Sequence, residues 1–426
     1  DDLAKFLDGN EFDIIAVGFL AARFRETIEP LCEVINQRKK NAWLVLGGPG
    51  PSPIPEYILK TTGVDAVAIG EAEETIVELV RCKAEKRGLF EVKGIAYLSA
   101  GKAIINGRRQ PVQKLDSIPF PEWPLFPMDK YLACLKPSGA AAKNISFGIV
   151  TSRGCVNRCN FCYRMEKGIR VRSIDNVVLE IKILNKNYGV DYFEIEDELF
   201  VISKKRILEF RDALKKEGLK IGFNCQARVD LFDEEIAELL LECGCKFLNF
   251  GMESSDQNVL NLMRKNTTVE QNIKAAEIAR KIGIGLGLNF IWGNLGDTEE
   301  SLSRNVELIK NYNTYDQLRT IRPVTPFPGS DLYYEAIRRG LLKGPEDFFD
   351  KFRNSDLATV NFTEIPLDKY YDLLFAANES LIIDHYTHTT KDMDAANNLI
   401  KDFHDLYFTG KVSFRGARHY DKEKDN

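Results

Sequence analysis

The sequence predicts an α/β protein: an incomplete (β/α)6 parallel barrel, preceded by part of a doubly wound sheet and followed by a helical region. Two alternations of short apolar runs with amphipathic stretches predict this class, one over the first ninety residues and a longer one from about 145 to 340. The last 85 residues are mostly helical and charged, which predicts a cap on the barrel or a small helical domain.

Three apolar runs near the N-terminus predict buried parallel strands, "FDIIAVGF" (12–19), "AWLVLGG" (42–48) and "VDAVAIG" (64–70). Amphipathic stretches supply helices at 25–40, 53–62 and 72–87. Three strands are only half of a doubly wound sheet, and the opening "DDLAKFLDGNEFD" resembles a helix that precedes a strand. Residues 1–92 are therefore expected to be a partial Rossmann-like domain whose N-terminal strands are missing.

Residues 93–143 are predicted to connect the two α/β parts. The segment 94–106, "GIAYLSAGKAIIN", is typical of a β-hairpin that turns at "SAGK". Six prolines between 111 and 137 exclude a long helix or a central strand, so an ordered surface linker is expected there.

Residues 144–341 are predicted to form the barrel, and residues 342–426 the C-terminal helical region. Strands are expected at 145–151, 191–197, 221–227, 246–252, 285–292 and 320–325. Helices are expected at 174–187, 203–217, 233–243, 269–282, 298–311 and 331–340. Six βα units in series fit an incomplete parallel barrel better than a closed eightfold one.

Composition and charge are those of an ordinary globular protein. Hydrophobic residues make up 44% of the 426 residues, and the net charge of −5 argues against a dedicated nucleic-acid binder. No apolar run is long enough to span a bilayer and no secretory signal opens the chain, so the expected compartment is the cytoplasm. In a reducing compartment the nine cysteines are expected to be thiols or metal ligands.

The stretch "TSRGCVNRCNFCYRM" places three cysteines, Cys155, Cys159 and Cys162, directly after the first predicted barrel strand. In parallel barrels the C-terminal ends of the strands form the face that carries chemistry. The C-x3-C-x2-C spacing lets one loop bind three irons of a [4Fe–4S] cluster and leaves the fourth iron open. Three alternatives remain: structural thiols, a zinc site with a distant ligand, or an electron-transfer cluster whose fourth cysteine is Cys225, Cys243 or Cys245, although core packing is expected for those three.

The signature "CVNRCNFC", followed by "CQARVDLFDEEIAELLLECGCKFLNFGMES" and "LNFIWGNLGDTEES", resembles the radical S-adenosylmethionine (SAM) superfamily over roughly 145–340, and within it the cobalamin-binding branch. The resemblance implies that the three cysteines bind the cluster and that SAM chelates the open iron through its amino and carboxylate groups. Reduction, by a partner such as flavodoxin or ferredoxin, would cleave SAM to methionine and a 5′-deoxyadenosyl radical, which takes hydrogen from a small-molecule substrate.

The same resemblance implies contacts to SAM near the first two strands. Phe161 occupies the aromatic position of the cysteine motif, near the adenine. The family's Gly-Gly-Glu is absent after the second strand, so Glu196, Asp197 or Glu198 would reach the SAM ammonium group instead.

Residues at the ends of later strands complete the implied SAM site. Arg228 would pair with the SAM carboxylate, with a surface salt bridge as the alternative. Glu253 would meet the ribose or methionine, with a purely structural role as the alternative. Asn289 would bind ribose hydroxyls, and Gly293 would let the backbone approach the adenine. "GNLG" stands here where many relatives have Gly-x-Pro-Gly.

Two Gly-rich turns in the N-terminal part resemble the loops that line cobalamin in this branch, with simple tight turns as the alternative for either turn alone. The residues are Gly47, Gly48, Pro49, Gly50, Ser52, Gly70 and Glu71. No Asp-x-His-x-x-Gly motif is present, so no histidine lower ligand is expected. If upstream strands are absent, cobalamin binding is expected to be weak or lost.

The resulting hypothesis is a cobalamin-dependent radical SAM enzyme that transfers a methyl group from methylcobalamin to an unactivated carbon or phosphorus. The alternative within the superfamily is radical oxidation or cyclisation without methyl transfer. From another class, the alternative is a non-catalytic Fe–S or zinc module. His385 and His388 have the spacing of a ligand pair but are expected to be solvated.

Overall fold

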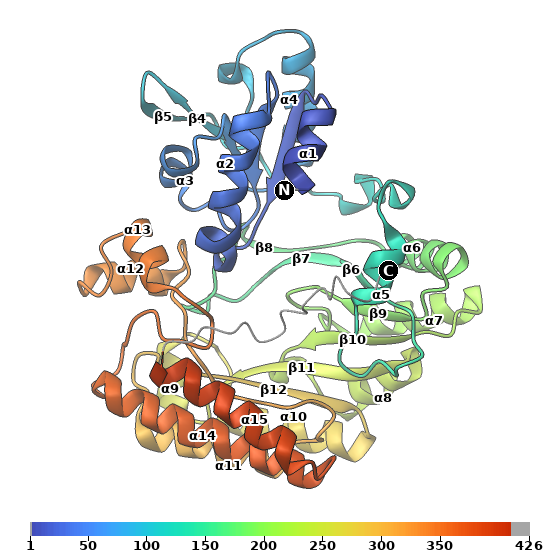
Figure 1. Ribbon diagram of the computed structural model, residues 1–426. Helices are drawn as coiled ribbons and strands as arrows, with labels where there is room; N and C mark the ends of the chain where they lie inside the picture. The colour runs from blue at the N-terminus through green and yellow to red at the C-terminus, as the bar shows by residue number, and fades with distance from the viewer. Residues whose placement is uncertain (1, 410–426) are drawn as a thin grey trace.

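The computed structural model describes residues 2–409 as two α/β parts (Figure 1). The N-terminal sheet has the strand order β1-β2-β3-β4-β5. Its strands are Ile14–Gly18, Trp43–Gly47, Ala66–Ala68, Ile95–Ser99 and Lys102–Ile105. Its helices are α1 (Asp2–Gly9), α2 (Glu29–Arg38), α3 (Pro55–Thr62) and α4 (Glu73–Ala84).

The first three strands are parallel, as the sequence predicts. The predicted hairpin also forms, as β4 and β5, but it pairs antiparallel with β3 through Val67 and Ala96 and so extends the N-terminal sheet. The hairpin therefore belongs to the N-terminal sheet and not, as the sequence suggests, to the linker. The linker contains one short α-helix, α5 (Met128–Cys134).

The second sheet has six parallel strands in the order β13-β12-β11-β10-β9-β6 and curls into a half-barrel. The strands are β6 (Ser146–Ile149), β9 (Tyr192–Ile195), β10 (Gly222–Ala227), β11 (Cys245–Glu253), β12 (Gly285–Trp292) and β13 (Arg322–Pro323). The helices are α6 (Ile174–Tyr188), α7 (Lys204–Glu217), α8 (Glu234–Cys243), α9 (Gln257–Leu262), α10 (Val269–Ile282) and α11 (Glu299–Tyr312). The predicted fold class is confirmed.

Local sequence signals set the bounds of the barrel helices. A side-chain cap from Ser, Asp or Thr begins each of them, at Ser173, Ser203, Asp233, Asp256, Thr268 and Thr298. A left-handed glycine ends four of them, at Gly189, Gly218, Gly244 and Gly283.

A hairpin that the sequence did not predict, β7 (Ser152–Cys155) and β8 (Gly168–Val171), lies between the two sheets in Figure 1. Its two strands approach closely because Gly154 has a φ of +87° and faces Gly168. A Cβ on Gly154 would lie 2.3 Å from the Gly168 carbonyl oxygen. The predicted first barrel strand therefore ends early, and β7 carries the chain to the cysteines.

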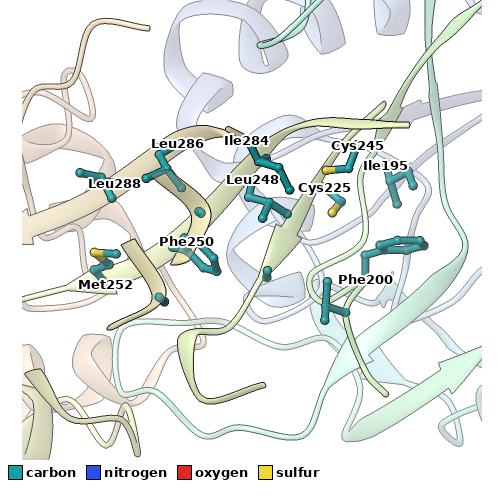
Figure 2. Packing of buried hydrophobic residues seen from close by; sticks show 14 of the residues in the cluster. Ile195, Phe200, Cys225, Cys245, Leu248, Phe250, Met252, Ile284, Leu286 and Leu288 are labelled. Carbon is teal, nitrogen blue, oxygen red and sulfur yellow. The ribbon is translucent and has the colours of Figure 1, made fainter. Parts of the chain in front are cut away.

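The barrel core lies between the sheet and the helices outside it. Alternate residues of the strands point into this layer, among them Cys225, Cys245, Leu248 and Phe250 (Figure 2). Cys243 belongs to the same buried cluster, so the predicted packing role of these three thiols is confirmed.

The C-terminal helices are shared between the two cores. They are α12 (Asp331–Arg338), α13 (Pro345–Lys351), α14 (Leu367–His388) and α15 (Met393–His404). The sequence assigned 331–340 to the barrel, but Leu332 and Tyr333 of α12 pack with Phe24 and Phe349 in the N-terminal core. It is α14 that covers the barrel, where Tyr370 stacks on Trp292 with ring centroids 4.4 Å apart.

Two further predictions concern the C-terminal region. His385 and His388 lie near the end of α14, and the ring of His388 stacks on Tyr315 with centroids 4.5 Å apart. The last part of the predicted region, 410–426, lies outside the described residues. Within 2–409, no helix is both long and apolar enough to cross a membrane.

Candidate functional site

The three cysteines lie on the loop that begins at β7, at the edge of the half-barrel where the parallel strands end. All three are free thiols outside the hydrophobic cores; Cys155 and Cys159 are half-buried and Cys162 is exposed. Within residues 2–409 no three His, Cys, Asp or Glu side chains are already gathered as a metal site. The loop thus offers three unused thiols on one short segment.

Asn160 fixes the cysteine loop to three other segments. Its backbone N–H donates to Met263 and its carbonyl accepts from Leu332, at 2.9 and 2.8 Å. Its side chain donates to Leu262 and accepts from the amide of Asn294, at 3.1 and 3.3 Å. Because Asn160 is 5% exposed, this network is shielded from water and holds the loop in place.

The surroundings of Cys159 and Cys162 favour the protonated form of their thiols. Burial raises the pKa of Cys159, and Glu253 adds to this while the cations of Lys265 and Arg228 oppose it. Although Cys162 as a whole residue is exposed, desolvation of its thiol, together with the charges of Cys159, Glu253 and Cys155, raises its pKa to about 11. Cys159 and Cys162 are therefore protonated near neutral pH and become ligands by losing their protons when a metal binds.

Of the three acidic residues that follow β9, two already bind the protein. Asp197 is buried and accepts hydrogen bonds from the N–H and hydroxyl of Thr151 and from the hydroxyl of Ser152, at 2.6 to 2.7 Å. Glu198 accepts from the N–H of Gly154 at 2.6 Å. Asp197 and Glu198 therefore hold the start of the hairpin, whereas Glu196 has no such bond to any residue in the described range 2–409.

Glu196 lies on the wall of a cavity of 370 Å³ between the Pro-rich linker and the edge strand β6. Its apolar wall includes Ile118, Phe120 and Trp123, and Arg153 lies at the same cavity. The carboxylate of Glu196 is thus exposed to a space that a ligand can enter.

A buried ion pair lies beside the cysteines at the end of β11. The Lys265 ammonium donates to the Glu253 carboxylate at 2.9 Å. Burial alone would lower the pKa of Lys265, but the charges of Glu253 and Cys159 outweigh burial and raise it. Glu253 has a φ of +66° and follows a β-bulge at Gly251, which directs its side chain toward Lys265.

Arg228 connects the cysteine loop to the end of β10. Its guanidinium forms a bidentate ion pair with Asp230, at 2.9 and 3.1 Å, and also donates to the backbone carbonyl of Lys265. With its amide oxygen facing Arg228, Asn157 accepts from the same guanidinium at 3.1 and 3.2 Å. The predicted bond from Arg228 to a SAM carboxylate would have to compete with these contacts.

The comparisons with known proteins agree with this geometry. Residues 149–309 match the model of the radical SAM superfamily. An uncharacterized methyltransferase of Pyrococcus horikoshii is 32% identical, over 80% of this chain and 73% of the relative. The chain belongs to the radical SAM superfamily.

Two further similarities point in different directions within the radical SAM superfamily. An anaerobic magnesium-protoporphyrin IX monomethyl ester cyclase of Rubrivivax gelatinosus is 30% identical, over 68% of this chain and 52% of the relative. The solved structure of OxsB, a cobalamin-dependent SAM radical enzyme, has a TM-score of 0.68 and 18% identity, over 95% of this chain and 68% of OxsB. The similarity to OxsB covers both α/β parts, so the two parts together form a fold that is already known.

The donor set fits a radical SAM cluster. The thiols on the loop are soft ligands, none is used in packing, and Lys265 and Arg228 supply positive charge that offsets deprotonated sulfur. The neighbouring concave face of the half-barrel carries half-exposed polar side chains, which are Glu194, Gln226, Asn249 and Asn289. A ligand bound there meets hydrogen-bonding groups on several strands.

The remaining residues predicted to contact SAM in this radical SAM chain have partners within the protein. Phe161 packs at the edge of the N-terminal core. Asn289 accepts from Arg319 at 3.1 Å. A Cβ on Gly293 would lie 2.3 Å from the hydroxyl of Tyr370, so this glycine makes room for α14. Their roles toward SAM stay predictions.

The residues predicted to line cobalamin divide into two groups. The Gly47–Pro49 turn is half-buried to exposed at the carboxyl end of β2. Gly50 instead accommodates Phe19, since a Cβ there would lie 2.6 Å from that ring. Ser52 donates to the Gly48 carbonyl at 2.8 Å and accepts from the Gly70 N–H at 3.2 Å. Among these residues only those of the first turn are open to a ligand, and they offer mainly backbone groups; that cobalamin binds against them stays a prediction.

Glu71 joins the N-terminal part to the hairpin that carries the cysteines. It forms ion pairs with Arg170 and, at 3.4 Å, with Arg153, which also pairs with Glu73 at 2.6 Å. We call these four residues the Glu71 clamp. Burial alone would raise the pKa of Glu71, but bonds from Arg170 and Val112 and the charge of Arg153 outweigh burial and lower it.

Sequence reasoning missed Lys265, Asn160 and the arginines of the Glu71 clamp. Lys265 lies in the polar segment "MRKNT", where nothing predicts a buried cation. Asn160 lies inside the cysteine motif, and its position between two ligands could have marked it as the residue that holds the loop.

Proposed function

We propose that this protein is a cobalamin-dependent radical SAM methyltransferase that methylates an unactivated carbon or phosphorus of a small molecule. The observation that carries the proposal is the placement of the cysteine loop. It lies at the C-terminal edge of a parallel half-barrel and is joined by the Glu71 clamp to the carboxyl end of the parallel strands of a second, mixed sheet. A cofactor on each side of this junction would face the same substrate.

The chain's own residues have distinct roles in this proposal. When bound, the cluster and cobalamin supply the electron that cleaves SAM and the methyl group that is transferred. Cys155, Cys159 and Cys162 hold the cluster, and Glu196 accepts a hydrogen bond from the SAM ammonium group. The turn at Gly47–Pro49 lies against the corrin. The cavity beside Glu196 admits substrate between the linker and β6.

The cellular setting of the proposal follows from the chemistry. The electron comes from a small reductase such as flavodoxin or ferredoxin. In this proposal the protein works in the cytoplasm. It also works under anaerobic conditions, because an iron–sulfur cluster with an open iron is sensitive to oxygen. Its substrate class includes natural products, by analogy with two further relatives, a cytidylyl-2-hydroxyethylphosphonate methyltransferase and a bacteriochlorophyllide d C-8(2)-methyltransferase.

The test is anaerobic turnover with SAM labelled in its methyl group. The methyltransferase proposal predicts labelled product with S-adenosylhomocysteine, and formation of both is lost in Cys159→Ala. Cys134→Ala is the matched control, since Cys134 is a free, exposed thiol outside the loop. Cleavage of SAM with no transfer of label would overturn methyl transfer.

A second candidate function, radical cyclisation or oxidation without methyl transfer, is favoured by the 30% identical cyclase. It predicts 5′-deoxyadenosine without labelled product in the same experiment. A non-catalytic Fe–S or zinc module predicts neither. Iron analysis separates that case, since about four irons per chain are expected for the enzyme.

A further inference from the structure

A half-buried cation without a close acidic partner lies on the concave side of the half-barrel. Arg319 precedes β13 by three residues, and its guanidinium lies 5.3 Å from the centre of the Phe247 ring. Among the described residues Arg319 forms no ion pair. Asp316 attracts it only from a greater distance.

Two side-chain oxygens and a glycine hold the guanidinium of Arg319 in place. It donates from Nη1 to the Asn289 side-chain oxygen at 3.1 Å and from Nη2 to the Gln317 side-chain oxygen at 2.5 Å. Gly287 is required beneath it, since a Cβ there would lie 2.7 Å from Nη2 and 2.3 Å from the Asn249 side-chain oxygen. The buried Nε of Arg319 has no acceptor.

This arrangement is costly for the protein alone. Burial, with repulsion from Arg322, lowers the pKa of Arg319 to about 10, which still leaves the group charged at neutral pH. A charge that is partly removed from water and lacks a close counter-ion destabilises a fold, and neutral amide oxygens compensate it only in part. A bound anion would accept a hydrogen bond from the unused Nε and would balance the positive charge of Arg319.

We propose that Arg319 binds an anionic oxygen group of the substrate, a carboxylate or a phosphate-type group, inside the half-barrel. A planar guanidinium matches two oxygens of such a group. Asn289 lies three residues before the end of β12 and Arg319 three residues before the start of β13, so the anion binds deeper than the cysteine loop and leaves the rest of the substrate facing it. The inference deepens the proposed function by naming the substrate class, and rests on it.

The test measures anion binding to the full chain without cluster or SAM. Inorganic phosphate and acetate are titrated separately by calorimetry at constant ionic strength, into the unchanged protein, Arg319→Gln and Arg338→Gln. Arg338 is the control because its side chain is 73% exposed on α12. We expect saturable binding of at least one anion, weakened tenfold or more in Arg319→Gln and unchanged in Arg338→Gln.

Thermal unfolding separates binding from folding. Arg319→Gln is expected to unfold at the same temperature as the unchanged protein or higher, because it removes an unpaired charge. If it unfolds lower and binding is lost, Arg319→Lys decides: binding within tenfold of the unchanged protein supports the site, and no binding overturns it. Binding of neither anion, or equal binding by Arg319→Gln, also overturns it. None of these readouts requires SAM cleavage, so the proposed function stands or falls separately.

Discussion

Lys265 and Glu253 are each almost enclosed, with side chains 9% and 11% exposed. Removing one partner of a buried pair leaves the other charge uncompensated, which costs about 3–5 kcal/mol. We expect Lys265→Met to lower the free energy of unfolding by about that amount, and the double variant with Glu253→Gln to recover much of it. Urea unfolding of the four proteins measures the coupling; simple additivity would contradict the pair's importance.

Asp297 closes the turn after β12 and is 4% exposed. Its carboxylate accepts from the N–H groups of Gly293 and Asn294, at 3.0 and 2.9 Å, and from the Ser301 hydroxyl. Burial nevertheless raises its pKa from 3.8 to about 7. Between these values the folded chain holds a proton that the unfolded chain has lost, so stability is greatest below the lower value and falls as pH rises through this window.

Asp297→Asn should therefore flatten the dependence of stability on pH. Relative to the unchanged protein, the Tm of the variant is expected to increase from pH 4 to pH 7, by about 2 °C or more. Calorimetric scans of the protein without cluster measure this difference. A constant Tm difference across the range would show that Asp297 does not titrate there.

Among the elements, the hairpin β7–β8 decides how the two α/β parts meet. Glu71→Gln removes the charge that holds Arg170 and Arg153, and we expect labelled product to fall several-fold more than SAM cleavage. The reason is that the cluster stays bound while its distance from the second sheet is no longer fixed. Glu74→Gln is the control, since that side chain is 61% exposed and lies outside the clamp. Equal loss of both activities would exclude a positioning role.

The same element predicts a response to acid. Because the pKa of Glu71 is lowered on folding from an ordinary value of 4.5, its contribution to stability is present above that pH and is lost as pH falls below it. Protease cleavage of the 111–137 linker should therefore accelerate below about pH 4.5 in the unchanged protein. In Glu71→Gln the cleavage should already be fast at neutral pH, and a pH-independent rate in both proteins would contradict the clamp.

The elements also show what the sequence could and could not predict. "GLGLNFIW" was predicted as a strand at 285–292 because it is an apolar run of strand length, and β12 has those bounds. "SRGC" and "GIRV" have no apolar alternation, and their pairing depends on Gly154 meeting Gly168, so β7–β8 was missed. The apolar face of α12 is evident from sequence, but periodicity does not tell which of two cores it enters.

The site shows the same division between local and distant signals. The cysteine spacing is local and could be recognised directly. Lys265 becomes important only because the bulge near Gly251 turns Glu253 toward it, and Glu71 only because the fold brings β8 alongside. Which of Glu196, Asp197 and Glu198 is free to bind a ligand could be decided only from the hydrogen bonds of the folded chain.

For the whole molecule, the central claim is that three thiolates hold an iron–sulfur cluster whose remaining iron binds SAM. Electron paramagnetic resonance of the reconstituted, reduced full chain tests it most directly. The account predicts the signal of a reduced [4Fe–4S] cluster that changes when SAM is added, and no such signal in the Cys155/Cys159/Cys162→Ala variant. A cluster signal that is unchanged by SAM, or that persists without the three cysteines, would contradict the account.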